Sequence, residues 1–284
     1  MDGQYIFHQS WVGDFLMCPE RGRLAAFHPQ LSDTEVRETD ASVLGTATHL
    51  AIERLILGDR RVEALDAAID YIDVTEFRAV QIKRKPTMYA HLASMVTAWE
   101  DDLRPLLSTP VSVEGGFRHE ISSSIVLEGH TDFEDEYGLW DWKTAGGRWQ
   151  DRYAPWMARK QIQPTFYTCQ RAGWKRHDPP DDYDTEYFAY GVMVKGVVPE
   201  AHAIPTERNV GDWAFMAHQL EQVIKLYETI GPDEPWPVVD NGWHCSEKWC
   251  DYWWSCKGAI TDPIGHAVFL ESRSGDEPTT EGEQ

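Results

Sequence analysis

The stretch GHTDFEDEYGLWDWKT, residues 129–144, places charged side chains inside two segments that alternate like β-strands. Side chains alternate faces along a strand, so Asp141 and Lys143 share one face of the second segment. Trp140 and Trp142 take the opposite face. Carboxylates and a lysine are unusual in strands that border a hydrophobic core. The expected pairing of the two strands suggests why they are there.

A turn over residues 135–138 joins the two segments and predicts an antiparallel register. The expected pairs are Glu134 with Leu139, Phe133 with Trp140, and Asp132 with Asp141. The last pair sets two carboxylates opposite each other, about 4.5–5.5 Å apart at Cβ. Like charges this close repel, and burying them costs several kcal/mol unless something compensates.

A divalent cation is the compensation that fits best, because hard ions such as Mg²⁺ prefer oxygen ligands. Lys143, two residues beyond Asp141 on the same face, could then orient a water or stabilise developing negative charge. The alternative is a hairpin whose solvated face carries Asp132, Asp141 and Lys143 as an ordinary ion pair.

Composition and charge narrow the class of protein. The chain of 284 residues is 42% hydrophobic and 26% charged, with 13 tryptophans, which is typical of a globular protein. It has no run of about 18 apolar residues and its start lacks the pattern of a secretory signal, so we expect a cytoplasmic protein. The net charge of −21 argues against non-specific coating of nucleic acid, but it permits a nucleic-acid enzyme with a small basic groove.

Periodicity along the chain predicts an α/β (α+β) core. Helices are expected from Ser10, a candidate N-cap, to Cys18, and over residues 41–58, 88–104, 159–174 and 212–230. Strands are expected over residues 112–121, 124–133 and 138–144, as an antiparallel meander, and over 185–195 and 197–204. We expect one domain over residues 1–270 and a disordered acidic tail over residues 271–284.

Two of the predicted helices add polar side chains that could join the carboxylates. His49 and Glu53 are spaced i and i+4, hence on one face of their helix, as are Gln163 and Tyr167 on theirs. His49 is either a satisfied structural histidine or a metal ligand through a neutral ring nitrogen. Gln163 and Tyr167 are either a solvent amide and a core ring or groups that hold a phosphate or a base.

In their order along the chain these motifs resemble the PD-(D/E)XK nuclease superfamily, and within it the RecB-like and Cas4-like exonuclease branch. The resemblance rests on Gly45-x-x-x-His49, Gly129-x-x-Asp132, Asp141-x-Lys143-Thr144 and Gln163-x-x-x-Tyr167. It implies a restriction-endonuclease-like core, in which a mixed central β-sheet is flanked by helices.

The resemblance also implies roles for these residues. His49, Asp132 and Asp141 would bind Mg²⁺ or Mn²⁺, and Lys143 would act with Asp132 and Asp141 in catalysis. Gln163 and Tyr167 would have supporting roles. Position 141 carries Asp where many members have Glu, and Pro164 follows Gln163 directly, which leaves Gln161 as a rival for the glutamine position.

The cysteines form a second pattern. Cys245-x4-Cys250-x5-Cys256 is compact enough for a shared metal centre that needs a fourth ligand. The segment FLMCPERGRL resembles the N-terminal part of iron–sulfur nucleases of the Cas4 and AddB groups, which implies that Cys18 completes a [4Fe–4S] cluster. The spacing departs from the C-x2-C-x5-C of many members, so zinc is the alternative. Cys169 is expected to be a small buried hydrophobe.

The resemblance implies a hydrolase that removes nucleotides from free DNA ends, with single-stranded ends expected, in recombination, repair, phage replication or CRISPR spacer processing. The alternative is a catalytically idle nuclease fold that binds DNA ends or proteins. An intact set of His49, Asp132, Asp141 and Lys143 favours the enzyme. Positive charge for the DNA backbone is expected from Lys83, Arg84, Lys85, Arg148, Arg152, Arg159 and Lys160.

Overall fold

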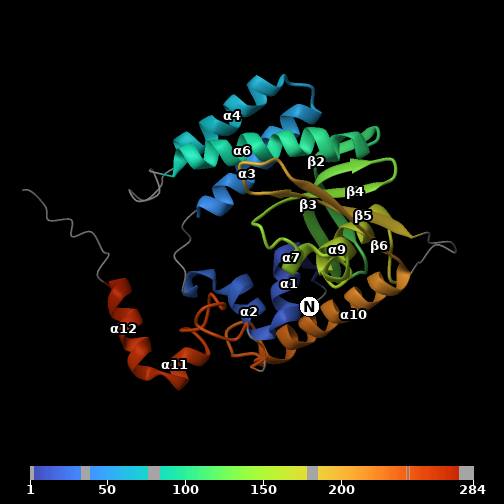
Figure 1. Cartoon of the computed structure of the whole chain (residues 1–284). Coiled ribbons are helices and arrows are strands. Elements are labelled where there is room, and N and C mark those ends of the chain that lie inside the picture. The colour runs from blue at the N-terminus through green and yellow to red at the C-terminus, as the bar shows by residue number, and fades with distance from the viewer. Residues whose placement is uncertain are drawn as a thin grey trace, which may run out of the picture. The chain divides into compact units, whose positions relative to one another are not determined.

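The computed structural model describes residues 3–32, 39–75, 84–177, 185–240, 242 and 244–274 (Figure 1). Its contacts divide the chain into two compact units. The first unit comprises Met1–Gln9 and Glu38–Gln222, and the second comprises Ser10–Arg37 and Val223–Gln284. The middle of the chain therefore builds one unit, and segments from near both ends build the other.

A six-stranded mixed sheet is the centre of the first unit. Its order is β1-β3-β4-β5-β6, with β2 on the other edge of β3; β1–β3 and β4–β5 are parallel and the other pairs antiparallel. The strands are β1 (Tyr5–His8), β2 (Pro110–Glu120), β3 (Ile125–Asp135), β4 (Gly138–Ala145), β5 (Glu186–Val194) and β6 (Ala201–Arg208). This sheet, flanked by helices, confirms the predicted fold class, and β2–β3–β4 form the predicted antiparallel meander.

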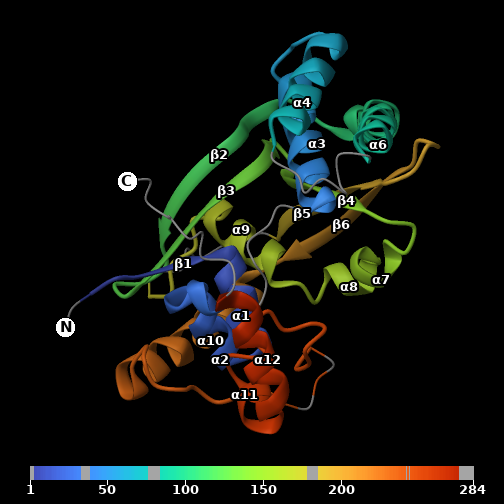
Figure 2. The same cartoon turned by 90° about the vertical axis from the view of Figure 1, so that its left-hand side faces the viewer.

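Strand β3 changes partners along one of its edges. β2 follows the other edge for nearly the full length of β3, as Figure 2 shows, so β1 and β4 share the remaining edge. β1 pairs with residues 125–128 and β4 with Phe133 and Glu134. Within these described strands, residues 129–132 have neither β1 nor β4 paired beside them. Asp132 lies in that gap, where side chains and not backbone pairing supply the contacts on this edge of β3.

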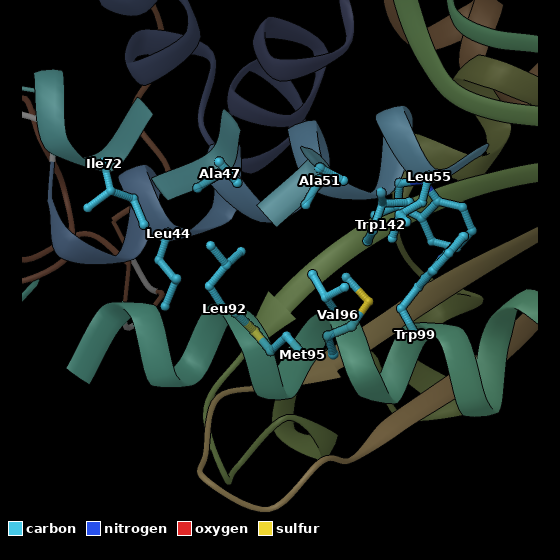
Figure 3. Packing of buried hydrophobic residues seen from close by; sticks show 14 of the residues in the cluster. Leu44, Ala47, Ala51, Leu55, Ile72, Leu92, Met95, Val96, Trp99 and Trp142 are labelled. Carbon is cyan, nitrogen blue, oxygen red and sulfur yellow. The ribbon is translucent and has the colours of Figure 1, made fainter. Parts of the chain in front are cut away.

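Helices α3 (Asp40–Ile56), α4 (Arg61–Val74) and α6 (Lys85–Ala98) pack on one face of the sheet. α6 continues into a π-helical turn, η2 (Trp99–Leu103), and a short 3-10 turn, η3 (Arg104–Leu106). Figure 3 shows the buried side chains between them: Leu44, Ala47, Ala51, Leu55, Ile72, Leu92, Met95, Val96, Trp99 and Trp142.

Trp142 joins the sheet to this helical layer. Its ring stands edge-on to Trp99, with centroids 6.0 Å apart. Its neighbour across the β4–β5 ladder is Gly191, where a Cβ would lie 2.5 Å from the Trp142 ring. Gly191 therefore makes room for the ring. Truncating a tryptophan this well buried is expected to cost about 3–5 kcal/mol.

Helix α9 (Ile162–Arg171) packs on the opposite face of the sheet. Residues paired in a parallel ladder share a face, and Asp141 pairs with Tyr190 while Leu139 pairs with Phe188. The Tyr167 ring of α9 stacks on Phe188, with centroids 6.3 Å apart. The predicted alternation is confirmed, because Asp141 belongs to the face that α9 covers and Trp142 belongs to the other.

Short helices complete the connections of the first unit. α7 (Gln150–Tyr153) and α8 (Pro155–Ala158) link β4 to α9. α10 (Val210–Ile230) follows β6, and its residues from Val223 onward belong to the second unit. None of the helices in the described ranges is both long and apolar enough to cross a membrane.

The second unit combines α1 (Gln9–Met17), α2 (Pro19–Phe27) and the 3-10 turn η1 (Pro29–Leu31) with the segment after α10, α11 (Lys257–Thr261) and α12 (Pro263–Ser274). Trp236, in the segment after α10, packs against the N-terminal helices α1 and α2. Its ring stacks on Phe15 with centroids 5.8 Å apart, and its backbone N–H donates to Glu20 Oε2 at 2.7 Å. Glu20 and Arg23, both buried, form an ion pair at 2.6 Å.

Several elements differ from those expected. α1 begins at Gln9, so Ser10 lies inside the helix and not at its N-cap. β1 and α4 were not expected, since β1 is four residues long and α4 buries small side chains, Ala64 and Ala68, with Ile72. Residues 271–274 of the predicted tail end α12, and residues 275–284 lie outside the described ranges.

Candidate functional site

Asp132 lies close enough to Asp141 for its charge to help raise the pKa of Asp141, but the expected backbone pairing of the two residues does not form. The β3–β4 ladder confirms the other two expected pairs, Phe133 with Trp140 and Glu134 with Leu139, and stops there. At the next step Asp132 Oδ2 accepts a hydrogen bond from the Trp142 backbone N–H at 2.7 Å. A side chain thus replaces the backbone acceptor, and the bond orients the Asp132 carboxylate.

The carboxylate that stands at the register of Asp132 is Glu114, on β2. Val113 pairs with Phe133 and Gly115 with Thr131, so Glu114 falls opposite Asp132. Its φ of 48° is left-handed, which is uncommon for a residue with a side chain. Backbone strain of this kind costs on the order of 1–3 kcal/mol and gathers at functional sites.

Glu114 was missed by the sequence analysis, which assigned the crowded carboxylate pair to Asp132 and Asp141. The physical expectation of two facing carboxylates holds, but the facing residue is on β2 and not on β4. A signal was present in the sequence, because Glu114 precedes Gly115 and Gly116 inside a strand. Paired glycines in a strand mark a local departure from regular pairing.

His49 reaches the same place from α3, with its Nδ1 3.5 Å from Asp132 Oδ2. His49, Glu114 and Asp132 each offer one ligand atom, all within 4.8 Å of one another, and the described residues hold no other such group of three. α3 approaches β4 closely, since a Cβ on Gly45 would lie 3.5 Å from Thr144 Oγ1. Gly45-x-x-x-His49 therefore places a small residue at the contact and the histidine one helical turn further along the same face.

An open hollow, here called the acidic hollow, adjoins this group. It is lined by Gly45, Thr46, His49, Leu50, Glu53, Tyr71 and Glu114. Burial, reinforced by the negative charges of Asp132, Glu53 and Asp141, raises the pKa of Glu114 to about 7. Carboxylates crowded in this way repel one another, and a bound cation removes the repulsion. The donor set of carboxylate oxygens and an imidazole nitrogen therefore fits a divalent metal.

Asp141 is buried beside this group and holds two polar partners. Its Oδ2 pairs with the Lys143 ammonium, and its Oδ1 accepts a hydrogen bond from Gln163 Nε2 at 2.7 Å. Burial raises the pKa of Asp141, against the lowering effect of Lys143. Burial by itself lowers the pKa of Lys143, but the charges of Asp141 and Asp132 outweigh it and raise that pKa. Lys143 therefore remains a cation.

The two candidate glutamines have different partners. Gln163 contacts Asp141, whereas Gln161 donates to the Arg152 carbonyl at 2.8 Å and accepts from the Tyr190 hydroxyl at 2.7 Å. Pro164 does not disturb Gln163, since it lies in the first turn of α9, where its missing N–H has no helical acceptor. Of the two glutamines, Gln163 is therefore the one that contacts a buried carboxylate.

Tyr167 follows Gln163 by one turn and lies nine-tenths buried. Its ring meets Phe117 edge-on, with centroids 5.9 Å apart. Burial and the charge of Asp141 raise its pKa to about 12, so Tyr167 stays a neutral phenol. The sequence-predicted residues of the first unit thus gather in one place, with Glu114 added to them.

Four of the five cysteines line one hollow in the second unit, here called the cysteine hollow. Cys18 lies between α1 and α2, and the other three come from the turns between α10 and α11. All the cysteines are free thiols. Those that line the hollow are Cys18, Cys245, Cys250 and Cys256, with His244, Tyr252 and Trp253 among the other lining residues. Cys169 is fully buried in α9, as expected.

Burial sets the chemistry of these thiols. It raises the pKa of Cys245 and Cys250, and it raises that of Cys256 to about 11 with help from the charge of Glu20. Cys18 Sγ accepts a hydrogen bond from the Val239 backbone N–H at 3.5 Å, which links Cys18 to the C-terminal segment. A metal centre here must displace protons from the thiols.

Comparison with known proteins bears on the first site most directly. A family model of the PD-(D/E)XK nuclease superfamily matches residues 11–257. A search of curated proteins found no match. The mixed sheet flanked by helices agrees with the restriction-endonuclease-like core of this superfamily, whose members are nucleases that use divalent metals. The chain therefore belongs to the PD-(D/E)XK nuclease superfamily, and its substrate is a nucleic acid.

Proposed function

We propose that the protein is a Mg²⁺- or Mn²⁺-dependent exonuclease that hydrolyses DNA from free, single-stranded ends. The observation that carries the proposal is the group formed by His49, Glu114 and Asp132 beside the Asp141–Lys143 pair. Hydrolysis of a phosphodiester needs an activated water and a means of stabilising negative charge, and a bound divalent metal supplies both. The free-end requirement and the preference for DNA rest on the resemblance to the RecB-like and Cas4-like branch.

The chain's own residues have distinct tasks in this proposal. His49, Glu114 and Asp132 hold the metal, with Asp141 as a further ligand. Lys143 stays protonated because of Asp141 and Asp132, so it can stabilise the negative charge that develops on the phosphate oxygens. Gln163 holds the Asp141 carboxylate in orientation through its 2.7 Å hydrogen bond.

End-labelled linear DNA and closed circular DNA test this proposal. Linear single strands, linear duplex and a covalently closed duplex circle are incubated with Mg²⁺, with Mn²⁺ and with a chelator. We expect loss of the linear single strand in either metal and survival of the circle in all conditions. Rapid linearisation of the circle would identify an endonuclease. No cleavage of any substrate would favour an idle fold that binds DNA ends or proteins.

A second part of the proposal concerns the cysteine hollow, which we assign to a metal centre held by Cys18, Cys245, Cys250 and Cys256. Four thiols that line one hollow are a donor set for zinc or an iron–sulfur cluster. The choice of a [4Fe–4S] cluster rests on the resemblance of the FLMCPERGRL segment to iron–sulfur nucleases, and a zinc site is the alternative.

A further inference from the structure

A second hollow lies at the end of β4, and we call it the basic hollow. It is lined by Thr144, Ala145, Gly146, Gly147, Arg148, Trp149, Arg152, Tyr153 and Lys195. Three of these residues are cations and none is a carboxylate. In a chain with 47 acidic and 26 basic residues, a concave surface of this composition is unusual. Its charge is opposite to that of the acidic hollow.

The cations of the basic hollow are not held in strong ion pairs with the carboxylates that the structure describes. Arg148 lies 3.7 Å from Asp151, but both side chains are mostly exposed, at 92% and 71%, so water screens the pair. Lys195 has no carboxylate within ion-pair distance among the described residues, and its backbone N–H donates to the Ala145 carbonyl at 2.7 Å. Partial burial lowers the pKa of Lys195, as expected for a cation without a nearby counter-charge.

Two of the other predicted DNA-contacting cations are already paired with carboxylates. Arg84 pairs with Asp40 at 2.9 Å and Lys85 with Asp73 at 3.1 Å. Lys83 lies outside the described residues. The lysine that completes the basic hollow, Lys195, is distant in sequence from Arg148 and Arg152. The β4–β5 pairing brings it beside them, because Val194 pairs with Ala145.

The basic hollow begins next to the candidate catalytic lysine. Thr144 and Ala145 directly follow Lys143, and a strand rises about 3.3 Å per residue. Aromatic rings also connect the two places. The Lys143 ammonium lies 6.0 Å from the centre of the Tyr190 ring, whose centroid is 5.5 Å from that of Tyr153. The Arg152 guanidinium in turn lies 5.6 Å from the centre of the Tyr153 ring.

We propose that the basic hollow binds a backbone phosphate of the DNA strand adjacent to the phosphate that is cleaved. Arg152, Lys195 and Arg148 supply charge, which makes the contact independent of sequence. Gly146 and Gly147 have open space where a side chain would project, so a phosphate can approach the backbone there. This inference rests on the proposed function, because it requires a nucleic-acid strand that crosses the Asp141–Lys143 pair.

The test is a binding measurement that does not depend on cleavage. The dissociation constant of the full chain for a fluorescein-labelled, mixed-sequence single-stranded DNA of 20 nucleotides is measured by anisotropy in a chelator, from 50 to 200 mM NaCl. Arg152→Gln and Lys195→Gln are compared with wild type. Each lost phosphate contact makes the slope of log K against log salt less steep by about 0.7 for a single strand. The loss of affinity of each variant relative to wild type therefore shrinks about 2.6-fold over this range.

Matched variants separate charge in the hollow from charge in general. Lys175→Gln removes one exposed charge outside the basic hollow and should leave the slope unchanged. Lys175 lies near the β2–β3 turn, because the backbone N–H of the next residue, Arg176, donates to the Ile121 carbonyl. Lys195→Arg should keep the wild-type slope. Arg152 is exposed, so Arg152→Gln is expected to fold, which a thermal melt of the variant checks. Slopes for Arg152→Gln and Lys195→Gln equal to that of Lys175→Gln would overturn the basic hollow. Cleavage in the chelator, or no cleavage in metal, would instead count against the proposed function.

Discussion

The carboxylate site of the first unit and the cysteine hollow of the second unit are held in place in different ways. In the first, Glu114, Asp132 and Asp141 stand on neighbouring strands, and backbone or amide hydrogen bonds orient two of the three. In the second, the proposed ligands come from a helix junction and from short turns after α10. The first site is therefore organised before a metal arrives, and the second is expected to depend on its metal for order.

The two sites also differ in the source of the unfavourable free energy when no metal is bound. Crowded carboxylates repel, so the first site stores unfavourable charge that a cation relieves. Protonated thiols are neutral and repel little, but the segments that carry them are far apart in sequence. Without a centre to join them, these segments are held together by contacts such as those of Trp236 with Glu20 and Phe15 and that of Ser255 with the Leu31 carbonyl. Metal removal should loosen the second unit and leave the first folded.

The largest effect is expected from Cys18→Ala. Removing this ligand opens a loop of more than two hundred residues, which in the simple entropy model is worth on the order of 5 kcal/mol. We expect the wild-type protein to be brown when purified without oxygen, with broad absorbance near roughly 400 nm, and Cys18→Ala to lose this colour and to melt at a clearly lower temperature.

Cys169→Ala is the control for that variant, because Cys169 is buried away from the cysteine hollow. It should keep the colour and lose about 1 kcal/mol or less from a small cavity. Anaerobic metal analysis decides the nature of the centre. Zinc in stoichiometric amount without iron or sulfide would replace the cluster by a zinc site, and a fully coloured Cys18→Ala would remove Cys18 from it.

A smaller free-energy effect, confined to the first unit, is expected from Lys143→Ala. Loss of one group that stabilises transition-state charge lowers the rate by about 10²–10³-fold, or about 3–4 kcal/mol. The variant leaves Asp141 buried without its cation, so the melting temperature should fall more at pH 8 than at pH 5.5, where the carboxyl can take up a proton. Cleavage of labelled single strands and thermal melts measure both.

Lys175→Gln serves as the matched loss of a lysine for the rate comparison. If Lys143→Ala cleaved DNA as fast as Lys175→Gln, the lysine would have no role in catalysis. If instead it lost its activity and its fold together at pH 5.5, the first site would depend on this pair for its structure, and the contrast with the cysteine hollow would weaken.

Glu114→Gln should reveal the charge stored in the first site. A carboxyl whose pKa rises on folding, here from 4.5 to about 7, favours the folded state at low pH, and that contribution is lost as pH rises through about 7. In a chelator the variant should therefore melt higher than wild type at pH 8 and about the same at pH 4.5. Mg²⁺ should stabilise wild type more than the variant, because the variant lacks a ligand. Equal metal-induced shifts in melting temperature would exclude Glu114 from the site.

The smallest effect is expected from the two glutamines. Gln163→Ala removes a hydrogen bond to a charged carboxylate and should lower the cleavage rate by roughly tenfold, an effect of about 1.5 kcal/mol. Gln161→Ala should lower the melting temperature instead, since Gln161 joins Tyr190 to the Arg152 backbone. The reverse result, with the rate loss in Gln161→Ala, would show that the functional glutamine was chosen wrongly.

Local sequence patterns were sufficient where the structure depends on near neighbours. Strand alternation and a short turn predicted the hairpin of β3 and β4, two of its pairs, and the face that Asp141 shares with Lys143. Helical spacing predicted that Gln163 and Tyr167 point the same way. α4 escaped notice because alanines form much of its buried face. β1 escaped notice because its pairing with β3 joins residues about 120 positions apart.

The sequence by itself determined the fold class, the hairpin and the residue types of both candidate sites, because these depend on periodicity and on short spacings. Tertiary structure alone decided which carboxylate faces Asp132. That partner is Glu114, since β2 follows the edge of β3 opposite the one shared by β1 and β4. Tertiary structure also places Lys195 at the end of β4 and Cys18 near the late cysteines. Such contacts join distant segments, and no local pattern records which segments will meet.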